Sequence, residues 1–188
     1  MCGRRLRVAL ILATILTVVS MGGGSWAAEV NGHRETRFSP EGGCTELLVK
    51  TIDNARHDIR ALVYSCTSKP IAAALIRAQE RGVVVRVVSD RVNLKGKGSV
   101  TPQLEAAGIE VKYDLVHKIM HDKVGVFDGS VVATGSFNWT EAAERSNAEN
   151  LNVIWDAAWA QDLLAEWGKL EAVSVPRAEA ETRIGNPF

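Results

Sequence analysis

The sequence predicts an α/β sandwich in which helices flank a mixed central β-sheet. From Cys44 to Tyr113, strand-like apolar runs alternate with segments of helical periodicity, an order typical of parallel strands joined by helices. Two further apolar runs, on either side of Asp128 and Gly129, instead indicate an antiparallel hairpin. The sheet is therefore expected to be parallel in its first part and antiparallel at the hairpin.

Each element has a local signal of its own. The first helix begins behind the break that ends at Gly43, and Gly82 and Gly108 end the next two. The expected helices are 44–56, 70–81 and 102–107, and the expected strands are 59–65, 83–89 and 109–113. After the hairpin we expect a helix at 140–145, a strand at 151–155 and a helix at 157–170. The tail from Glu171, with Pro176 and Pro187, is expected to be loosely ordered.

The first 27 residues have the composition of a secretory signal. Three arginines precede an apolar stretch at 8–19, and Ser25, Trp26 and Ala27 fit the pattern of a cleavage site. We therefore expect cleavage near Ala27, a periplasmic or secreted protein, and one catalytic domain over 28–188. A retained membrane anchor is the alternative, although the apolar stretch is short for a membrane span.

The charge balance argues against a surface that binds polyanions everywhere. The chain has 22 basic and 22 acidic residues, and loss of the signal with its three arginines leaves an excess of acid. A polyanion must therefore bind locally. Arg91, Lys95 and Lys97, in a glycine-containing stretch, are the candidate contacts to a nucleic-acid backbone, and a solvated flexible loop is the alternative.

The hairpin carries polar residues that its packing does not require. His121 and Lys123 come before the turn, Asp128 stands at it, and Ser136 and Asn138 follow the second strand. A site that binds a phosphodiester and attacks its phosphorus needs a nucleophile, a fixed cation and hydrogen-bond donors. This set of residues contains all three. Because strand residues two apart share a face, His121 and Lys123 are expected to point the same way.

The length of the turn decides which residues face each other across the hairpin. A two-residue turn at Asp128 and Gly129 would bring the hydroxyl of Ser136 opposite the imidazole of His121, and this is the predicted register. A three-residue turn would put Phe137 opposite His121 instead.

The segment from His121 to Asn138 resembles the signature of the phospholipase D superfamily, His-x-Lys-x4-Asp-x6-Gly-Ser-x-Asn, and matches it without a gap. Nearly the whole chain after the signal is also similar to the small exported bacterial endonucleases of that superfamily, which carry one such motif. The resemblance implies a phospholipase D-like sandwich and phosphodiester hydrolysis through a phosphohistidine, without metal or other cofactor. Because the sequence has no repeat that could supply a second motif, the resemblance also implies a homodimer with its active site at the two-fold interface.

The resemblance assigns roles to the matching residues. His121 would attack phosphorus, and its copy in the second subunit would protonate the leaving oxygen. Lys123 and Asn138 would stabilise the non-bridging oxygens, with help from Ser136. Glu149 matches a glutamate that follows the motif in the small endonucleases, and its expected role is to orient the imidazole. The alternative for Glu149 is a charged residue that merely begins a strand.

Asp128 and the two cysteines beyond the signal each have more than one possible role. Asp128 belongs to the signature and to the candidate catalytic set, but its place at the turn predicts a structural role, such as pairing with a nearby cation, rather than proton transfer. Cys44 and Cys66 fall at the same edge of the predicted sheet, so an exported protein could hold them as a disulfide or as two free thiols.

Three functions fit the sequence. We favour a metal-independent nuclease that cuts DNA or RNA, because the short, exported form with one motif is that of the endonucleases. A phospholipase D acting on phosphatidylcholine-like lipids would share the motif, but the sequence shows no basic amphipathic helix or exposed apolar segment for docking on a bilayer. A non-catalytic phosphate-binding or dimeric interaction protein is the third, which the complete motif disfavours.

Overall fold

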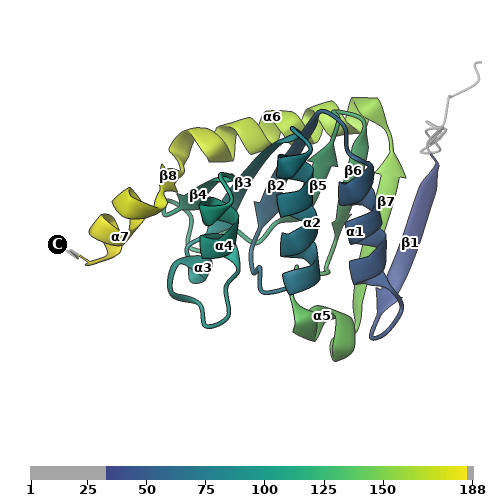
Figure 1. The fold of residues 1–188 in the computed structure, drawn as a ribbon, viewed down its shortest axis with the longest axis horizontal. Coiled ribbons are helices and arrows are strands. Elements are labelled where there is room, and N and C mark those ends of the chain that lie inside the picture. Colours follow the sequence, from purple (N-terminus) through teal and green to yellow (C-terminus); the bar gives the residue numbers. More distant parts are fainter. Residues whose placement is uncertain (1–32, 186–188) are drawn as a thin grey trace, which may run out of the picture. The chain divides into compact units, whose positions relative to one another are not determined.

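The computed structural model describes residues 33–185, and in this range one eight-stranded sheet organises the chain (Figure 1). The strands are β1 Arg34–Ser39, β2 Asp58–Val63, β3 Val84–Asp90, β4 Glu110–Asp114, β5 Lys123–Phe127, β6 Val131–Gly135, β7 Glu149–Trp155 and β8 Val175–Pro176. Their order across the sheet is β1-β7-β6-β5-β2-β3-β4-β8. The strands β2, β3 and β4 run parallel and the other pairs are antiparallel, which confirms the predicted mixed sheet.

Helices cover both faces of this sheet. They are α1 Cys44–Asn54, α2 Lys69–Glu80, α3 Val92–Lys95, α4 Thr101–Ala106, α5 Glu141–Arg145, α6 Ala157–Val173 and α7 Arg177–Gly185. Figure 1 shows α1, α2 and α4 over one face and the long α6 across the other. The larger hydrophobic core lies under α1 and α2 and includes Ile59 and Phe127, whereas Leu62 and Val126 pack in a second core with Trp167 of α6. Alternate strand residues thus serve opposite cores, as the period of a strand requires.

The sequence signals located most elements to within a few residues, but they missed β1. This strand is RETRFS, and most of its side chains are exposed or half-buried at the edge of the sheet, where it pairs with β7. An edge strand with so many polar residues lacks the apolar run by which strands are recognised.

The segment from Glu171 to Gly185 is ordered, which corrects the expectation of a loose tail. α6 continues to Val173, β8 pairs with β4, and α7 follows. Arg177 anchors the segment, because its Nε donates to Glu105 at 2.5 Å and its guanidinium carbon lies 5.0 Å from the centre of the Tyr113 ring. Pro176 does not prevent pairing, since it lies on an edge strand where no ladder N–H is required of it.

The hairpin between β5 and β6 has a three-residue turn, which corrects the predicted register. Phe127 pairs with Val131, one residue later than expected. Asp128 and Gly129 both have left-handed backbones, with φ of 50° and 61°, and the N–H of Ser130 donates to the oxygen of Phe127 at 3.1 Å. Ser130 is thus an additional residue in the turn. Counted on from this pairing, His121 falls opposite Phe137 rather than Ser136, as the alternative register implied.

Cys44 and Cys66 are free thiols, so the structure does not contain the disulfide that the topology allowed. Burial raises the pKa of Cys44 to about 11 and that of Cys66 to about 12. Disulfide formation requires a thiolate, and these buried thiols stay protonated at neutral pH.

The predicted signal and its cleavage near Ala27 lie outside the described residues. Within 33–185, no helix combines the length and the apolar composition that a membrane crossing requires.

Candidate active site

The signature residues His121 and Lys123 lie at one end of the sheet because of the way β5 pairs with β2. Val63, the last residue of β2, pairs with Lys123, the first of β5, and the N–H of Tyr64 donates to the oxygen of Asp122 at 3.0 Å. The carboxyl ends of β3, β4 and β6 and the start of β7 lie along the same edge. We call this end of the sheet the site edge.

Lys123 is a fixed and largely buried cation. Its side chain emerges from β5 with 7% of the residue exposed, and its Nζ donates to the backbone oxygen of His121 at 2.6 Å. Burial lowers the pKa of Lys123, and the negative charges of Asp122 and Glu149 offset part of that effect. An ammonium held in this way keeps its other N–H groups for an incoming anion and needs little reorganisation to meet one.

His121 is exposed beside this cation, with its imidazole against an aromatic ring. The ring centres of His121 and Tyr64 are 4.5 Å apart and the planes are tilted by 54°. The imidazole therefore stands at the surface, where a substrate or a second subunit can reach it. Sequence reasoning missed Tyr64, because the strand pairing that brings residue 64 beside residues 121–123 is a property of the fold.

Ser136 and Asn138 follow β6 to the site edge in a tight turn around Asn150. The N–H of Asn150 donates to Oγ of Ser136 at 3.1 Å, and the N–H of Ser136 donates back to Oδ1 of Asn150 at 3.3 Å. A Cβ on Gly135 would lie 2.1 Å from the backbone oxygen of Asn150, which explains the glycine of the signature. The Oδ1 atom of Asn138 is buried without a hydrogen-bond partner among the described residues, so its amide is not committed to the fold. Asn150 is a further positioning residue that the sequence did not indicate.

Glu149 lies at the site edge but does not orient His121 within one subunit. It is the first residue of β7, and its Oε1 accepts from the side-chain amide of Asn147 at 3.1 Å. In the described part of the chain its carboxylate has no hydrogen bond to His121. Glu149 and Ser136 instead line an open hollow of about 330 Å³ beside the exposed ring of Phe38.

Asp128 lies at the other end of β5 from Lys123, away from the site edge. Its carboxylate accepts from the backbone N–H groups of Arg56, His57 and Asp58 at 2.9, 2.7 and 3.0 Å, so it ties the hairpin to the start of β2. Burial alone would raise the pKa of Asp128, but these hydrogen bonds outweigh it and hold the pKa below its ordinary value. These contacts favour the structural role that its position at the turn predicted, with backbone amides rather than a cation as partners.

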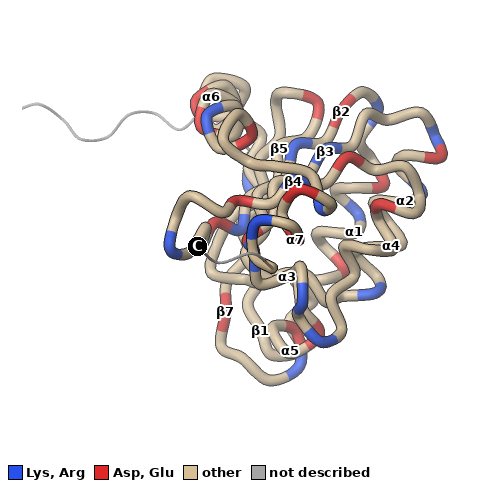
Figure 2. Tube along the Cα trace, turned by 90° about the vertical axis from the view of Figure 1, so that its left-hand side faces the viewer, with Lys and Arg blue, Asp and Glu red and all other residues tan. Residues whose placement is uncertain are grey.

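The candidate basic loop divides into one structural arginine and two exposed lysines. The guanidinium of Arg91 donates to the backbone oxygens of Leu115 and His117, so part of its hydrogen-bonding capacity serves the fold. Lys95 and Lys97 are exposed. Figure 2 shows basic and acidic positions interspersed along the described chain rather than gathered on one surface.

Two buried carboxylates also hold the loop that leads to His121. Asp90 accepts from the N–H of Met120 at 2.8 Å, and Asp114 accepts from Nδ1–H of His117 at 2.6 Å. Both aspartates follow parallel strands to the site edge. Within 33–185, no group of three or more His, Cys, Asp or Glu residues is arranged to hold a metal ion.

Comparison with known proteins agrees with this architecture. Residues 48–170 match the family described as "Cardiolipin synthase, PLD-like domain". The chain is 47% identical to a phospholipase D of Rickettsia bellii over 132 residues, which are 70% of this chain and 66% of the relative. It is 34% identical to the mitochondrial cardiolipin hydrolase of Xenopus laevis over 73% of this chain and 62% of that protein. The chain thus spans just under two thirds of the length of these relatives.

Solved structures give the same picture. The phospholipase D family member Nuc of Salmonella typhimurium superposes with a TM-score of 0.74 at 36% identity, over 77% of this chain and 97% of that chain. NucT of Helicobacter pylori has a TM-score of 0.72 at 24% identity, which shows the shared fold alone. By its sequence and its fold, the chain belongs to the phospholipase D superfamily.

Proposed function

We propose that the protein hydrolyses phosphodiesters through a phosphohistidine on His121, and that nucleic acid is its substrate. The observation that supports this proposal is the pairing of an exposed imidazole with a fixed ammonium at the site edge, where Nζ of Lys123 lies 2.6 Å from the backbone oxygen of His121. A nucleophile and a cation fixed to each other in this way can receive the same phosphate group.

The reaction would proceed in two displacements. A ring nitrogen of one His121 attacks phosphorus, the bond from phosphorus to the leaving oxygen breaks, and His121 of the partner subunit gives that oxygen a proton. Water then attacks the phosphohistidine, gives its proton to the same partner imidazole, and releases the phosphomonoester. Lys123, Asn138 and Ser136 would bind the non-bridging oxygens, and no step requires a metal ion.

A homodimer would complete this site. His121 is exposed, and Glu149 has no bond to it within the subunit, so a two-fold axis at the site edge would bring a second copy of each into reach. Mixing wild-type and His121→Ala subunits tests this arrangement. Because both imidazoles serve one site, the mixed dimer should be inactive, and activity should fall more steeply than the wild-type fraction. A linear fall would contradict the shared site.

Nucleic acid is favoured as the substrate because the chain resembles the small exported endonucleases and has the exposed Lys95 and Lys97 beside the site edge. The test is cleavage of supercoiled plasmid in excess EDTA. Wild type and His57→Ala should cleave it and His121→Ala should not. His57 is a matched control, since its side chain is exposed and its hydrogen bond to Asp128 is made by the backbone N–H. Failure of the wild type to cleave would refute the nuclease.

A phospholipase is the second candidate, and a surface feature favours it. Val92, Val116 and Ile119 are exposed by 43%, 63% and 50%, which corrects the expectation that no apolar segment is available for docking. Lys95 and Lys118 are exposed beside them, on the two segments that Arg91 joins. Exposed apolar side chains with lysines on the same segments suit an anionic bilayer. The relatives named phospholipase D and cardiolipin hydrolase agree with this candidate.

Choline release from phosphatidylcholine vesicles that contain anionic lipid tests the second candidate. A phospholipase should lose this activity in the Val116→Ser, Ile119→Ser double variant while it keeps hydrolysis of a small soluble diester. If neither plasmid nor lipid is cleaved, the non-catalytic phosphate-binding alternative replaces both. Export is a separate proposal, and recovery of the protein in the periplasm or medium, with an N-terminus near residue 28, tests it.

A further inference from the structure

The backbone of Tyr64 is fixed on both sides at the end of β2. Its N–H donates to the oxygen of Asp122 at 3.0 Å, and its oxygen accepts from the side-chain amide of Asn93 at 2.8 Å. Asn93 is itself buried, and its Oδ1 accepts from the N–H of Cys66 at 3.1 Å. Tyr64 therefore cannot shift without breaking bonds both to the signature segment and to α3.

The ring of Tyr64 contacts both groups on which the proposed reaction depends. Its centre lies 4.5 Å from that of the His121 imidazole and 5.0 Å from Nζ of Lys123. Both distances are within the range of favourable aromatic and cation–π contacts. Nζ of Lys123 in turn donates to the backbone oxygen of His121, so the three residues form a closed set of contacts. In contrast, the Tyr64 hydroxyl has no hydrogen bond to protein within residues 33–185.

We propose that Tyr64 is a positioning residue whose ring holds the imidazole of His121 and the ammonium of Lys123 in a fixed relation to each other. This inference rests on the proposed phosphodiesterase function. The ring limits rotation of the exposed imidazole and covers one side of the ammonium. The attacking nitrogen and the cation are then already oriented toward the same phosphate group. Misplacement of either by about 1 Å is enough to lower the rate of the chemical step severely.

Hydrolysis of bis(4-nitrophenyl) phosphate in EDTA tests the inference, because a small diester depends on the reacting groups and not on a groove or a membrane. Tyr64→Phe keeps the ring and should keep kcat within about twofold of the wild type. Tyr64→Leu removes the ring and should lower kcat roughly tenfold or more, with a smaller change in KM, because orientation acts on the chemical step.

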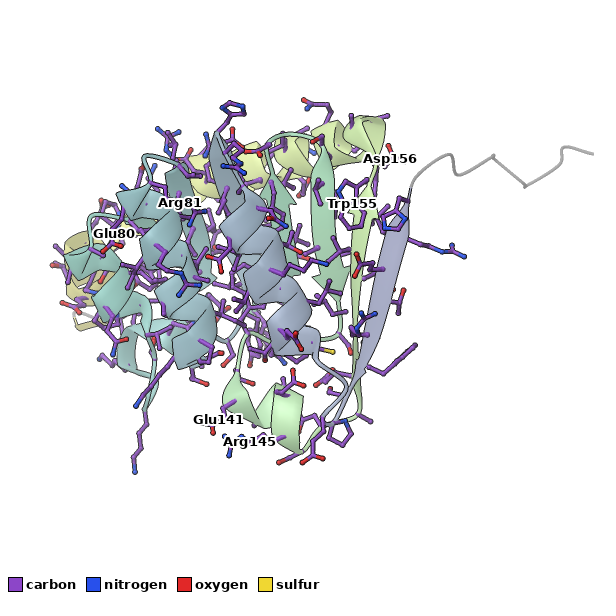
Figure 3. The ribbon with its side chains drawn as sticks, turned by 45° about the vertical axis from the view of Figure 1, so that its right-hand side comes forward. Glu80, Arg81, Glu141, Arg145, Trp155 and Asp156 are labelled. Carbon is purple, nitrogen blue, oxygen red and sulfur yellow. The ribbon has the colours of Figure 1, made fainter. Side chains whose placement is uncertain are left out.

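Trp155→Leu is the matched control for the loss of a partly exposed aromatic residue. Figure 3 shows Trp155 and Asp156 at the end of β7 away from α5, which carries Glu141 and Arg145. This control should leave kcat unchanged, and Tyr64→Leu should melt within a few degrees of the wild type. The inference is wrong if Tyr64→Leu keeps its kcat, or if Tyr64→Phe loses as much as Tyr64→Leu.

A second readout separates this inference from the proposed function. The chain has four histidines, so the imidazole proton resonances are few, and the Hε1 resonance that disappears in His121→Ala belongs to His121. The ring of Tyr64 should shift this resonance, and Tyr64→Leu should remove the shift while Tyr64→Phe preserves it. The inference is wrong if the chemical shift of this resonance is the same in Tyr64→Leu as in the wild type. If the wild type cleaves no diester although the shift is present, the proposed function fails and the ring contact stands.

Discussion

The structural role of Asp128 can be tested by removing its carboxylate. This residue belongs to the signature, yet it lies at the far end of β5 from Lys123 and accepts from the N–H groups of Arg56, His57 and Asp58. We therefore predict that its substitution destabilises the fold and leaves the chemistry at His121 largely intact. A catalytic role for Asp128 predicts the opposite pattern.

The magnitude follows from the hydrogen bonds and the backbone. Bonds to a charged acceptor contribute about 1.5–3 kcal/mol each, but water can reach the exposed N–H groups of Arg56 and His57, so we expect about 2 kcal/mol for the three together. Asp128 also has a φ of 50°, which costs Ala about 1 kcal/mol. Asp128→Ala should thus lose about 3 kcal/mol. Asp128→Gly fits the backbone and should lose about 2 kcal/mol, and Asp128→Asn should lose about 1 kcal/mol.

Urea unfolding and plasmid cleavage measure the two effects separately. The pKa of Asp128 is lowered in the folded protein, so its stabilising effect is complete well above the ordinary Asp pKa of about 3.9 and disappears as the pH falls through the folded value. The stability difference between wild type and Asp128→Asn should shrink accordingly in acid. At neutral pH the folded variant should keep kcat within about threefold. An Asp128→Asn protein of wild-type stability but without activity would refute the reasoning.

Three further predictions concern buried or half-buried groups. Lys123→Met should lower kcat by about 10²–10³-fold without loss of stability, because it removes a cation whose burial is unfavourable. Because the pKa of Lys123 is lowered in the folded protein, the stability of the wild type should rise with pH as the ammonium loses its proton. Urea unfolding at several pH values should show that this rise is absent from Lys123→Met. Cys44 and Cys66 should resist a thiol-specific disulfide reagent at pH 8 in the folded protein and react in urea, and rapid reaction when folded would contradict their burial. Arg177→Leu should lower the free energy of unfolding by about 2 kcal/mol with unchanged cleavage, since its contact with Glu105 anchors the C-terminal helix, and wild-type stability would contradict that anchor.

Local patterns predicted the alternating elements and the mixed sheet well, because glycine stops and apolar periods are properties of short segments. The ordered tail was not predictable in this way. Its stability comes from the contacts of Arg177 with Glu105 and Tyr113, which are far away in sequence. The predicted register of the hairpin was wrong for a similar reason. The sequence marked the turn at Asp128 and Gly129 but not the inclusion of Ser130, and the turn contacts the start of β2, which is far away in sequence.

The candidate site shows the same division between motif and fold. The motif predicted that His121 and Lys123 lie together, and both contact the ring of Tyr64 at the site edge. His121 precedes β5, so strand alternation does not set the direction of its side chain. The residues that hold them were not predictable, because Tyr64 and Asn150 reach the site only through the pairing of β2 with β5 and of β6 with β7. The structural contacts of Arg91 were not predictable for the same reason, since its carbonyl partners belong to the loop after β4.

Stereochemistry at phosphorus tests the central claim most directly. The substrate would be an isotopically labelled phosphorothioate diester of known configuration, hydrolysed by the wild type in EDTA. A phosphohistidine on His121 requires two in-line displacements, and each inverts the configuration at phosphorus. The account therefore predicts a product in which the configuration is retained overall. Inversion would mean that water attacks the diester directly, and it would contradict a covalent role for His121.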